Sequence, residues 1–549
     1  MIRFEIKYFP AMERGRLWIA FVLAGLTLAC WHALVAGRSV DDFPVGYDPF
    51  GYLQSAKEIR SAFSDRRLPD FWIKDLRAEK LVAFFKAKGL PPDRWGSLCG
   101  PWTYNYQPRN GKVVVQYPPG TGLLLSLFPE GQAVKDLNTL DALGLLLVGG
   151  WGLIRAFRLR ACVSAGFVAI VIHLALDTLR GIHLDSFSIN ALMVPLALSI
   201  VLLFFGPKKG EGFRWAVSGG LFGFCFLCRI PVLFLLPGMV LAAWAVGQKK
   251  GAAWFVAGWI LFGAVPILVH QQRATGAWYA STYGGGDTVP PNLGAMLGNI
   301  RYYLLVGGGS RYNWELLLLL AGCGGLAWRR RLVPPGSSET LPDARVGAAA
   351  AVVWGVPAAY FLLHPVHNAY YVFPSSFGAA LTLAFGTLAV QRGPDPSATS
   401  GAPARFTPGW KKAAAVFLAA LPAVAMSAHA WGRLALPPGG QLPRGSFYRT
   451  IPADLSADRA WVWGGVSAGT VYYYTGTPAF SATFVDREIL RDAYEFVVGQ
   501  GDTLYLIDDG PMMRLRLDWV RQWGGSLERA GVVSYWPYYR VHPEDGRSG

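Results

Sequence analysis

Long apolar segments recur along this chain, and short polar connections separate them. The first, residues 17–36, carries no formal charge and as a helix would be about 30 Å long, the thickness of a membrane hydrocarbon core. Further apolar segments lie near 137–157, 161–178, 187–205, 214–228, 232–247, 252–270, 312–328, 346–363, 372–390 and 413–431. The pattern predicts a polytopic α-helical membrane protein with about eleven transmembrane helices.

The first apolar segment has a second interpretation, because Arg14 and Arg16 precede it as they would precede the core of a signal peptide. Its apolar region is longer than the roughly 7–15 residues of a typical signal core, and many apolar segments follow. We therefore expect an uncleaved first transmembrane helix.

Lysines and arginines concentrate in alternate connections between the apolar segments. They are Arg3, Lys7, Arg14 and Arg16; Arg155, Arg158 and Arg160; Lys208, Lys209 and Arg214; Lys249 and Lys250; Arg329, Arg330 and Arg331; and Arg392, Lys411 and Lys412. If the helices alternate in direction, all of these residues fall on one side, which the positive-inside rule assigns to the cytoplasm. We expect a multi-pass protein of the plasma (inner) membrane with a cytoplasmic N-terminus. Residues 37–116, 177–186, 271–311 and those after about 432 then lie outside.

The chain divides into four regions by composition. Residues 1–36 form the cytoplasmic N-terminus and first transmembrane helix, 37–120 the first extracytoplasmic loop, 121–431 the transmembrane helical body, and 432–549 an extracytoplasmic domain. In the first loop, Pro49–Phe63 and Leu76–Lys88 mix apolar and charged residues at helical spacing, which predicts interfacial helices.

The last region alternates short strands with helices. Strands are predicted at 461–466, 503–507 and 534–541, and helices at 468–475, 487–498 and 512–523. This alternation indicates a small α/β domain. Gly464 and Gly465 follow its first strand, where a ligand loop and an ordinary strand-to-helix turn both favour glycine.

Composition and charge agree with a membrane protein and argue against several other classes. Of 549 residues, 52% are hydrophobic and 16% are charged, whereas a soluble domain has about 25% charged residues. The net charge of +16 follows largely from the cytoplasmic lysines and arginines, so no nucleic-acid partner is implied. Cys225 and Cys228 have the spacing of a metal or redox pair, but they lie in an apolar helix, which favours packing.

Ionisable residues gather at the predicted outer ends of the apolar segments, where they are costly near lipid. Asp48 follows the first segment and suits a general base, with Asp41 and Asp42 as less well placed candidates. The other candidates are Asp185, Arg229, Arg273, Arg301, Arg311, His183, His367 and Tyr370. Carboxylates with arginines suit a site that deprotonates an acceptor and holds a phosphate. For each residue alone, a solvated loop, a helix cap or a snorkelling side chain is the simpler interpretation. Pro365 separates His364 from His367, so no metal site is predicted.

Several short motifs in this chain resemble, in their order, those of the GT-C superfamily of integral-membrane glycosyltransferases. They are Tyr47–Ala56 around Asp48, Tyr117-Pro118-Pro119-Gly120, His183–Phe187 around Asp185, Gly219–Pro231 with Arg229-Ile230-Pro231 at its end, Asn368–Pro374 and Trp461–Phe480. The nearest branch comprises bacterial relatives of protein O-mannosyltransferases and the lipid A aminoarabinose transferase. The chain departs from that pattern at His367 and Asn368, where members usually have arginine.

The resemblance implies that the protein transfers a sugar from a polyprenyl-phosphate donor to an acceptor hydroxyl at the outer membrane face. Asp48 and Asp185 are then the catalytic candidates. The substrate and phosphate candidates are Arg229, Arg273, Arg301, Arg311, Tyr117, His183, His367 and Tyr370. The resemblance implies no cofactor, although oligosaccharyl relatives use a divalent metal and that alternative stays open. The expected partners are the lipid-linked sugar, membrane lipids, and an acceptor that is a glycan, a lipid or a protein. Two further alternatives are a transporter or flippase of lipid-linked sugars and a non-catalytic membrane scaffold.

Overall fold

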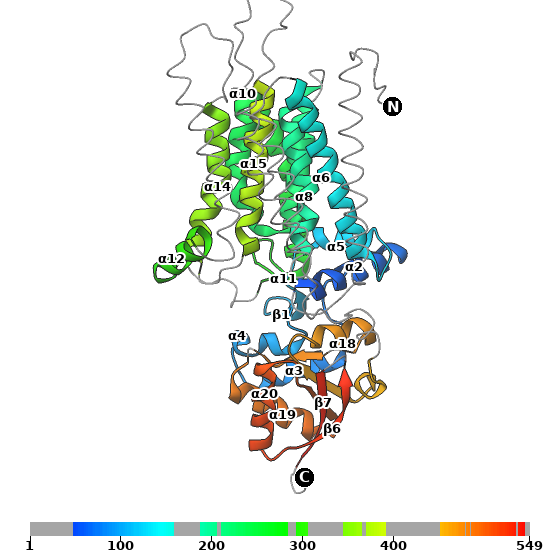
Figure 1. Cartoon of the computed structure of the whole chain (residues 1–549). Coiled ribbons are helices and arrows are strands. Elements are labelled where there is room, and N and C mark those ends of the chain that lie inside the picture. The colour runs from blue at the N-terminus through cyan, green and yellow to red at the C-terminus, as the bar shows by residue number, and fades with distance from the viewer. Residues whose placement is uncertain are drawn as a thin grey trace, which may run out of the picture.

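The structure is a computed structural model, which describes residues 48–158, 187–205, 210–283, 292–305, 344–364, 369–390, 451–477, 479–483, 485–533 and 536–543. Figure 1 shows a bundle of long helices with a smaller α/β domain at one end. Elements from residues 48–126 lie where the bundle and the C-terminal domain meet (Figure 1). This arrangement agrees with the polytopic helical protein and C-terminal α/β domain expected from the sequence.

The bundle consists of helices that match the predicted apolar segments. They are α6 (Ala133–Arg158), α8 (Phe187–Phe204), α9 (Glu211–Cys228), α10 (Leu236–Trp259), α11 (Val265–Thr275), α14 (Ala344–Leu363) and α15 (Ala369–Val390). Among the described residues, Ile230–Thr275, Arg345–Leu363 and Tyr371–Ala389 are long and apolar enough to cross a membrane, and Ser188–Phe204 is a shorter apolar helix. The predicted segments 17–36, 161–178, 312–328 and 413–431 lie outside the described residues, so the number eleven stays a prediction.

The 46-residue candidate Ile230–Thr275 contains a reversal at Gln248, whose φ of 52° and ψ of −149° are not helical. Glycines show how the two halves lie. A Cβ atom at Gly247 would lie 2.4 Å from the Trp215 ring near the start of α9, and one at Gly251 would touch that ring at 3.4 Å. A Cβ atom at Gly263 would instead meet Gly223 further along α9. The second half therefore runs parallel to α9 and the first half antiparallel to it. This agrees with two predicted segments, 232–247 and 252–270, joined at Lys249 and Lys250.

Basic residues mark the end of the bundle that is remote from the C-terminal domain. Lys249 and Lys250 lie at the reversal, Arg214 lies in the first turn of α9 beside it, and the Arg345 guanidinium is 5.5 Å from the Trp244 ring. Figure 1 shows the C-terminal domain at the opposite end. The described members of the predicted cytoplasmic connections thus lie at one end of the bundle, and the orientation itself stays a prediction.

The long loop that precedes the bundle contributes α2 (Asp48–Ser64), α3 (Leu76–Ala87), α4 (Pro92–Trp95), the antiparallel strands β1 (Tyr104–Gln107) and β2 (Lys112–Val115), and α5 (Pro119–Ser126). Both predicted loop helices form, but α3 is not an interfacial helix. Phe84 stacks on Phe496 at 4.5 Å, and Arg77 donates to the carbonyl of Ala460 at 2.8 Å. The apolar face of α3 therefore packs against the C-terminal domain and not against lipid.

The C-terminal domain is built on a five-stranded sheet of order β4-β3-β5-β7-β6. Its elements are β3 (Ala460–Gly464), α18 (Ala468–Thr475), β4 (Ala479–Ser481), α19 (Arg487–Gly499), β5 (Thr503–Ile507), α20 (Pro511–Gln522), β6 (Ser526–Val533) and β7 (Trp536–His542). Strand β3 is parallel to β4 and β5, and β7 is antiparallel to β5 and β6. All six predicted elements are present, whereas β4 and β6 were not predicted.

Candidate functional site

The start of α2 packs against Tyr117, which precedes the two prolines of α5. Asp48 is the first residue of α2, and Gly51 lies one turn further. A Cβ atom at Gly51 would lie 2.5 Å from the Tyr117 ring, so only glycine lets the ring approach this closely. The rings of Tyr52 and Tyr117 are 4.6 Å apart between centroids, and Tyr283 meets Tyr117 edge-on at 6.2 Å. Tyr117 is therefore fixed beside the turn of α2 that begins at Asp48.

The next residues of the same peptide reach the end of α9. A Cβ atom at Gly120 would lie 2.5 Å from the carbonyl carbon of Leu227 and 2.6 Å from the backbone nitrogen of Cys228. The Thr121 hydroxyl donates to the carbonyl of Cys228 at 3.4 Å. Arg229 follows directly. The Tyr-Pro-Pro-Gly peptide thus connects the helix of Asp48 to the residue that precedes Arg229.

Arg229 ends α9 and is buried inside the bundle. Its backbone is extended, with φ −155° and ψ 113°, which turns the chain into the 3₁₀ segment Ile230–Leu235. The side chain is 7% exposed; its Nη1 donates to the Ser188 hydroxyl at 3.0 Å, and the guanidinium lies 5.6 Å from the ring centroid of Tyr371. One guanidinium therefore joins α8, α9 and α15. A snorkelling arginine would have an exposed head, so this interpretation does not apply here.

The remaining sequence candidates fall into three groups. Arg273, on α11, forms an ion pair with Asp70 at 3.4 Å, and Arg301 is exposed on the π-helical segment Arg301–Leu305. Asp48 and Tyr370 are placed in α2 and α15 by their backbones. Asp41, Asp42, His183, Asp185, Arg311 and His367 lie outside the described residues. The structure thus brings together Tyr117, the helix of Asp48 and Arg229, and the roles of all these residues stay predictions.

An apolar groove adjoins this site on the side of α2 and α5. It has a volume of about 270 Å³ and is lined by Ile59, Phe63, Leu68, Pro69, Phe71, Trp72, Pro119, Leu123, Pro266, Val269, His270, Arg273 and Ala274. His270 is 7% exposed, and its Nε2 has no hydrogen-bond partner among the described residues. The groove therefore combines hydrocarbon walls with one buried imidazole nitrogen.

Asp141 on α6 is a residue that the sequence reasoning missed. It is 1% exposed, and its Oδ2 has no hydrogen-bond partner in the described part of the chain. It lies one turn after Asn138, whose side chain accepts a hydrogen bond from Asn190 of α8. The signal was present in the sequence, because an ionisable residue inside a membrane segment is usually functional.

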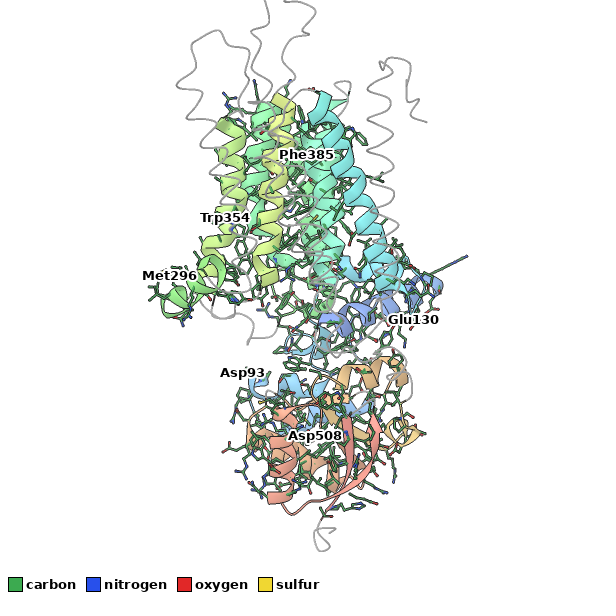
Figure 2. All side chains as sticks on the ribbon, in the orientation of Figure 1. Asp93, Glu130, Met296, Trp354, Phe385 and Asp508 are labelled. Atoms are coloured by element: carbon green, nitrogen blue, oxygen red, sulfur yellow. The ribbon has the colours of Figure 1, made fainter. Side chains whose placement is uncertain are left out.

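The C-terminal domain touches the site through α18. A Cβ atom at Gly469 would lie 2.5 Å from the Phe50 ring, and that ring also contacts Tyr104 and Tyr472 at 6.1 and 6.3 Å. Lys57 of α2 donates to the carbonyl of Tyr473 at 2.7 Å. Figure 2 places Glu130, which accepts from the Tyr473 hydroxyl, at the same end of the bundle. The domain therefore packs on α2 at Phe50, which lies two residues after Asp48.

The glycine turn after β3 is filled by a side chain of its own domain. The backbone nitrogens of Gly465 and Ser467 donate to the Asp509 carboxylate at 2.9 and 2.7 Å, and the Ser467 hydroxyl donates to it as well. Burial raises the pKa of Asp509, and these hydrogen bonds oppose the rise. The turn is a structural junction between β3 and β5, so the interpretation as a ligand loop is not supported.

Comparison with known proteins shows which solved structures have a similar fold. No family model and no curated protein matches the sequence. The crystal structure of ArnT from Cupriavidus metallidurans in the apo state superposes with a TM-score of 0.51 at 13% identity, covering 96% of this chain and 98% of that one. The chain has the fold of ArnT. A second ArnT structure, bound to undecaprenyl phosphate, gives a TM-score of 0.49 over the same coverage.

The ArnT-like fold agrees with the architecture that the motif resemblance implies. The ArnT-like fold extends over nearly the whole chain, including the C-terminal domain. At 13% identity the likeness establishes architecture, and the chemistry has to be argued from the residues.

Proposed function

We propose that the protein is a polyprenyl-phosphate-dependent glycosyltransferase that moves a sugar to an acceptor hydroxyl at the membrane face next to the C-terminal domain. The observation that carries the proposal is the peptide Tyr117–Gly120, which joins the helix of Asp48 to Arg229 within an ArnT-like fold. A general base and a buried guanidinium at one end of a helical bundle are what transfer from a phosphate-linked donor requires.

Asp48 takes the proton of the acceptor hydroxyl in the proposed reaction. The acceptor oxygen attacks the anomeric carbon of the donor, and the bond between that carbon and the phosphate oxygen breaks. Polyprenyl phosphate leaves with the bonding electrons, and Arg229 stabilises its growing charge. A single displacement inverts the anomeric configuration. Asp185 orients the acceptor or the donor, and Arg273, Arg301, Arg311, His183, His367 and Tyr370 contribute substrate contacts.

The apolar groove beside α2 is the proposed seat of the first part of the donor's hydrocarbon chain. Its walls include Pro119, which immediately follows the Tyr117–Pro118 pair, so the groove begins next to the proposed reaction centre. Two of its lining residues, Phe63 and Val269, are 60% and 54% exposed, so the groove opens onto the outer surface of the bundle. A chain in the groove would therefore pass from the site into lipid without meeting water.

The C-terminal domain is proposed to lie outside the cytoplasm, because the basic short connections, with Arg214, Lys249, Lys250 and Arg345, lie at the opposite end of the bundle. The protein then belongs to the plasma (inner) membrane. No cofactor is proposed, and transfer is expected to persist in excess EDTA. Loss of transfer in EDTA with recovery on addition of Mg²⁺ or Mn²⁺ would show a metal-dependent reaction.

The decisive experiment supplies purified protein with a radiolabelled polyprenyl-phosphate sugar and an envelope extract from cells that lack the protein. A glycosyltransferase moves label into a new molecule, and Asp48→Asn abolishes this. A transporter in vesicles moves the labelled donor unchanged, and a scaffold does neither. Mass spectrometry of envelope glycans and glycolipids from cells with and without the protein then identifies the acceptor. Unchanged glycans and no label transfer with any extract would refute the proposal.

A further inference from the structure

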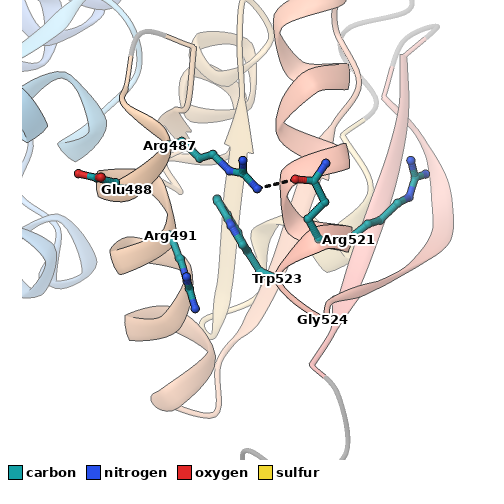
Figure 3. A pocket seen from close by; sticks show the side chains of 7 residues that line it. Arg487, Glu488, Arg491, Arg521, Trp523 and Gly524 are labelled. Carbon is teal, nitrogen blue, oxygen red and sulfur yellow. Dashed lines mark hydrogen bonds between the residues drawn. The ribbon is translucent and has the colours of Figure 1, made fainter.

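A hollow of about 460 Å³ lies on the C-terminal domain, between the start of α19 and the end of α20 (Figure 3). Arg487, Glu488 and Arg491 line it from α19, and Arg521, Gln522, Trp523 and Gly524 from the end of α20. Gly524 has a φ of 90°, which ends the helix and turns the chain away from Trp523. The volume is within the range of about 300–1,000 Å³ typical of small-molecule sites.

Arg487, Arg491 and Trp523 face this hollow. Arg521 also lines it and pairs with Asp518 at 2.7 Å. Arg487 donates to the side-chain oxygen of Gln522 across it, and Trp523 lies between Arg487 and Arg491 (Figure 3). The Trp523 ring is supported from behind by Tyr494, at 5.7 Å between centroids. Glu488 points the other way, toward Arg94 at 3.5 Å. The side of the hollow that a ligand would meet is therefore cationic and aromatic.

The arrangement is unfavourable for the domain alone. Arg487 and Arg491 are four residues apart on one face of α19, where like charges repel. Arg491 pairs with Glu495 at 2.9 Å, but both side chains are about half exposed, and exposed pairs of this kind are weak. Arg491 can therefore bind an anion at little cost, whereas Arg487 would exchange its neutral hydrogen bond with Gln522 for a stronger charged one. A planar guanidinium binds a phosphate or a carboxylate through two parallel hydrogen bonds.

We propose that this hollow binds an anionic sugar unit, one that carries a phosphate or a carboxylate, of the acceptor glycan. The assignment to an acceptor rests on the proposed transferase function. Arg487 and Arg491 hold the anionic group, and the C–H face of the sugar ring packs on Trp523. Phe496 of α19 stacks on Phe84 of α3 at 4.5 Å, and Lys57 of α2 donates to the carbonyl of Tyr473 at 2.7 Å, so a glycan bound here is held in a fixed position relative to α2.

The test is isothermal titration calorimetry on the full-length protein in detergent, with glucose 6-phosphate, glucuronic acid, glucose and inorganic phosphate as probes. We expect the two charged sugars to bind, glucose not to bind, and inorganic phosphate to bind more weakly than glucose 6-phosphate. The double variant Arg487→Gln/Arg491→Gln should weaken glucose 6-phosphate binding by at least about tenfold, because charged hydrogen bonds are lost. Arg514→Gln is the matched control, since Arg514 is an exposed arginine of α20 paired with Asp508 at 3.2 Å, away from the hollow.

Trp523→Leu provides a second, independent variant, which should reduce sugar phosphate binding to the level of inorganic phosphate. Absence of binding by either charged sugar, or undiminished binding by the double variant, would overturn the proposal. Equal affinity for inorganic phosphate and glucose 6-phosphate would overturn the sugar assignment. In the transfer assay the double variant should raise the acceptor KM and leave the donor KM unchanged. Intact sugar binding by a protein without transferase activity would refute the transferase alone, and intact acceptor KM in the double variant would refute this site alone.

Discussion

The contact between Gly120 and the end of α9 makes a sharp prediction, because it joins the two halves of the proposed site through backbone atoms. In Gly120→Ala the new Cβ would lie 2.5 Å from the Leu227 carbonyl carbon, 2.6 Å from the Cys228 nitrogen and 2.7 Å from the Leu227 oxygen. Ordinary contact begins at 3.4 Å, so the shortfall is 3.4 Å less 2.5 Å, about 0.9 Å. No flexible side chain can give way, and α5 must move away from α9.

A shift of this size separates the helix of Asp48 from Arg229. A misplacement of about 1 Å costs up to roughly 10²-fold in rate, and overpacking of this kind costs about 1–3 kcal/mol of stability. We therefore expect Gly120→Ala to lower turnover about 10- to 100-fold in the radiolabel transfer assay, with a modestly lower thermal midpoint and normal membrane insertion.

The matched control is Gly347→Ala on α14, where nothing lies within 4 Å of the new methyl group. Alanine is also the better helix former, so this variant should keep wild-type turnover and stability. The reasoning is wrong if Gly120→Ala turns over like the wild type while its thermal midpoint is unchanged. It is also wrong if Gly347→Ala is equally impaired, because the effect would then not depend on the contact with α9.

Three further predictions concern single groups. Asp48→Asn should lower turnover about 10²–10⁴-fold with donor binding unchanged, and full activity would remove Asp48 as the base. Arg229→Lys keeps the charge but loses the planar geometry, so the donor KM should rise, and rise further in Arg229→Ala; an unchanged donor KM in both would leave Arg229 with a structural role only. Burial raises the pKa values of Tyr104 and Tyr472 well above the ordinary value of 10.0, so the folded state retains protons that the unfolded chain loses. Stability should therefore fall as the pH rises above about 10, and less so in Tyr104→Phe/Tyr472→Phe, as thermal unfolding at pH 9, 10 and 11 would show.

The apolar and polar periodicity predicted most elements of the described chain. Helix α18 has the predicted bounds, and α9, α14 and α15 agree with their apolar segments within a few residues. Strand β4 was missed because it has three residues, too few for a pattern. Strand β6, SLERAGVV, was missed because it is an edge strand with mostly exposed polar positions, which resemble a loop.

The packing partner of a helix was harder to predict than the presence of the helix. The apolar face of α3 is the same whether it meets lipid or protein, and the structure shows that it meets Phe496. The contacts of Gly51 with Tyr117 and of Gly120 with Cys228 are likewise non-local, so a single sequence indicates a small residue but not its neighbour. Asp141 differs, because its place inside an apolar segment was visible and only its burial had to be found.

The position of α2 also depends on non-local contacts, in this case with the C-terminal domain. Lys57 and Tyr473 are 416 residues apart in the chain, and Phe50 fits against Gly469 where any larger residue would displace it. The helix that begins with Asp48 is therefore held on one side by α5 and Tyr117, and on the other by α18. A short motif around Asp48 suggests a base but not the position of its helix, which is set jointly by the bundle and by a domain encoded at the far end of the chain. Because the domain packs on α2, it borders the proposed site. In the proposed reaction its hollow, with Arg487 and Arg491, then lies on the side from which the acceptor approaches.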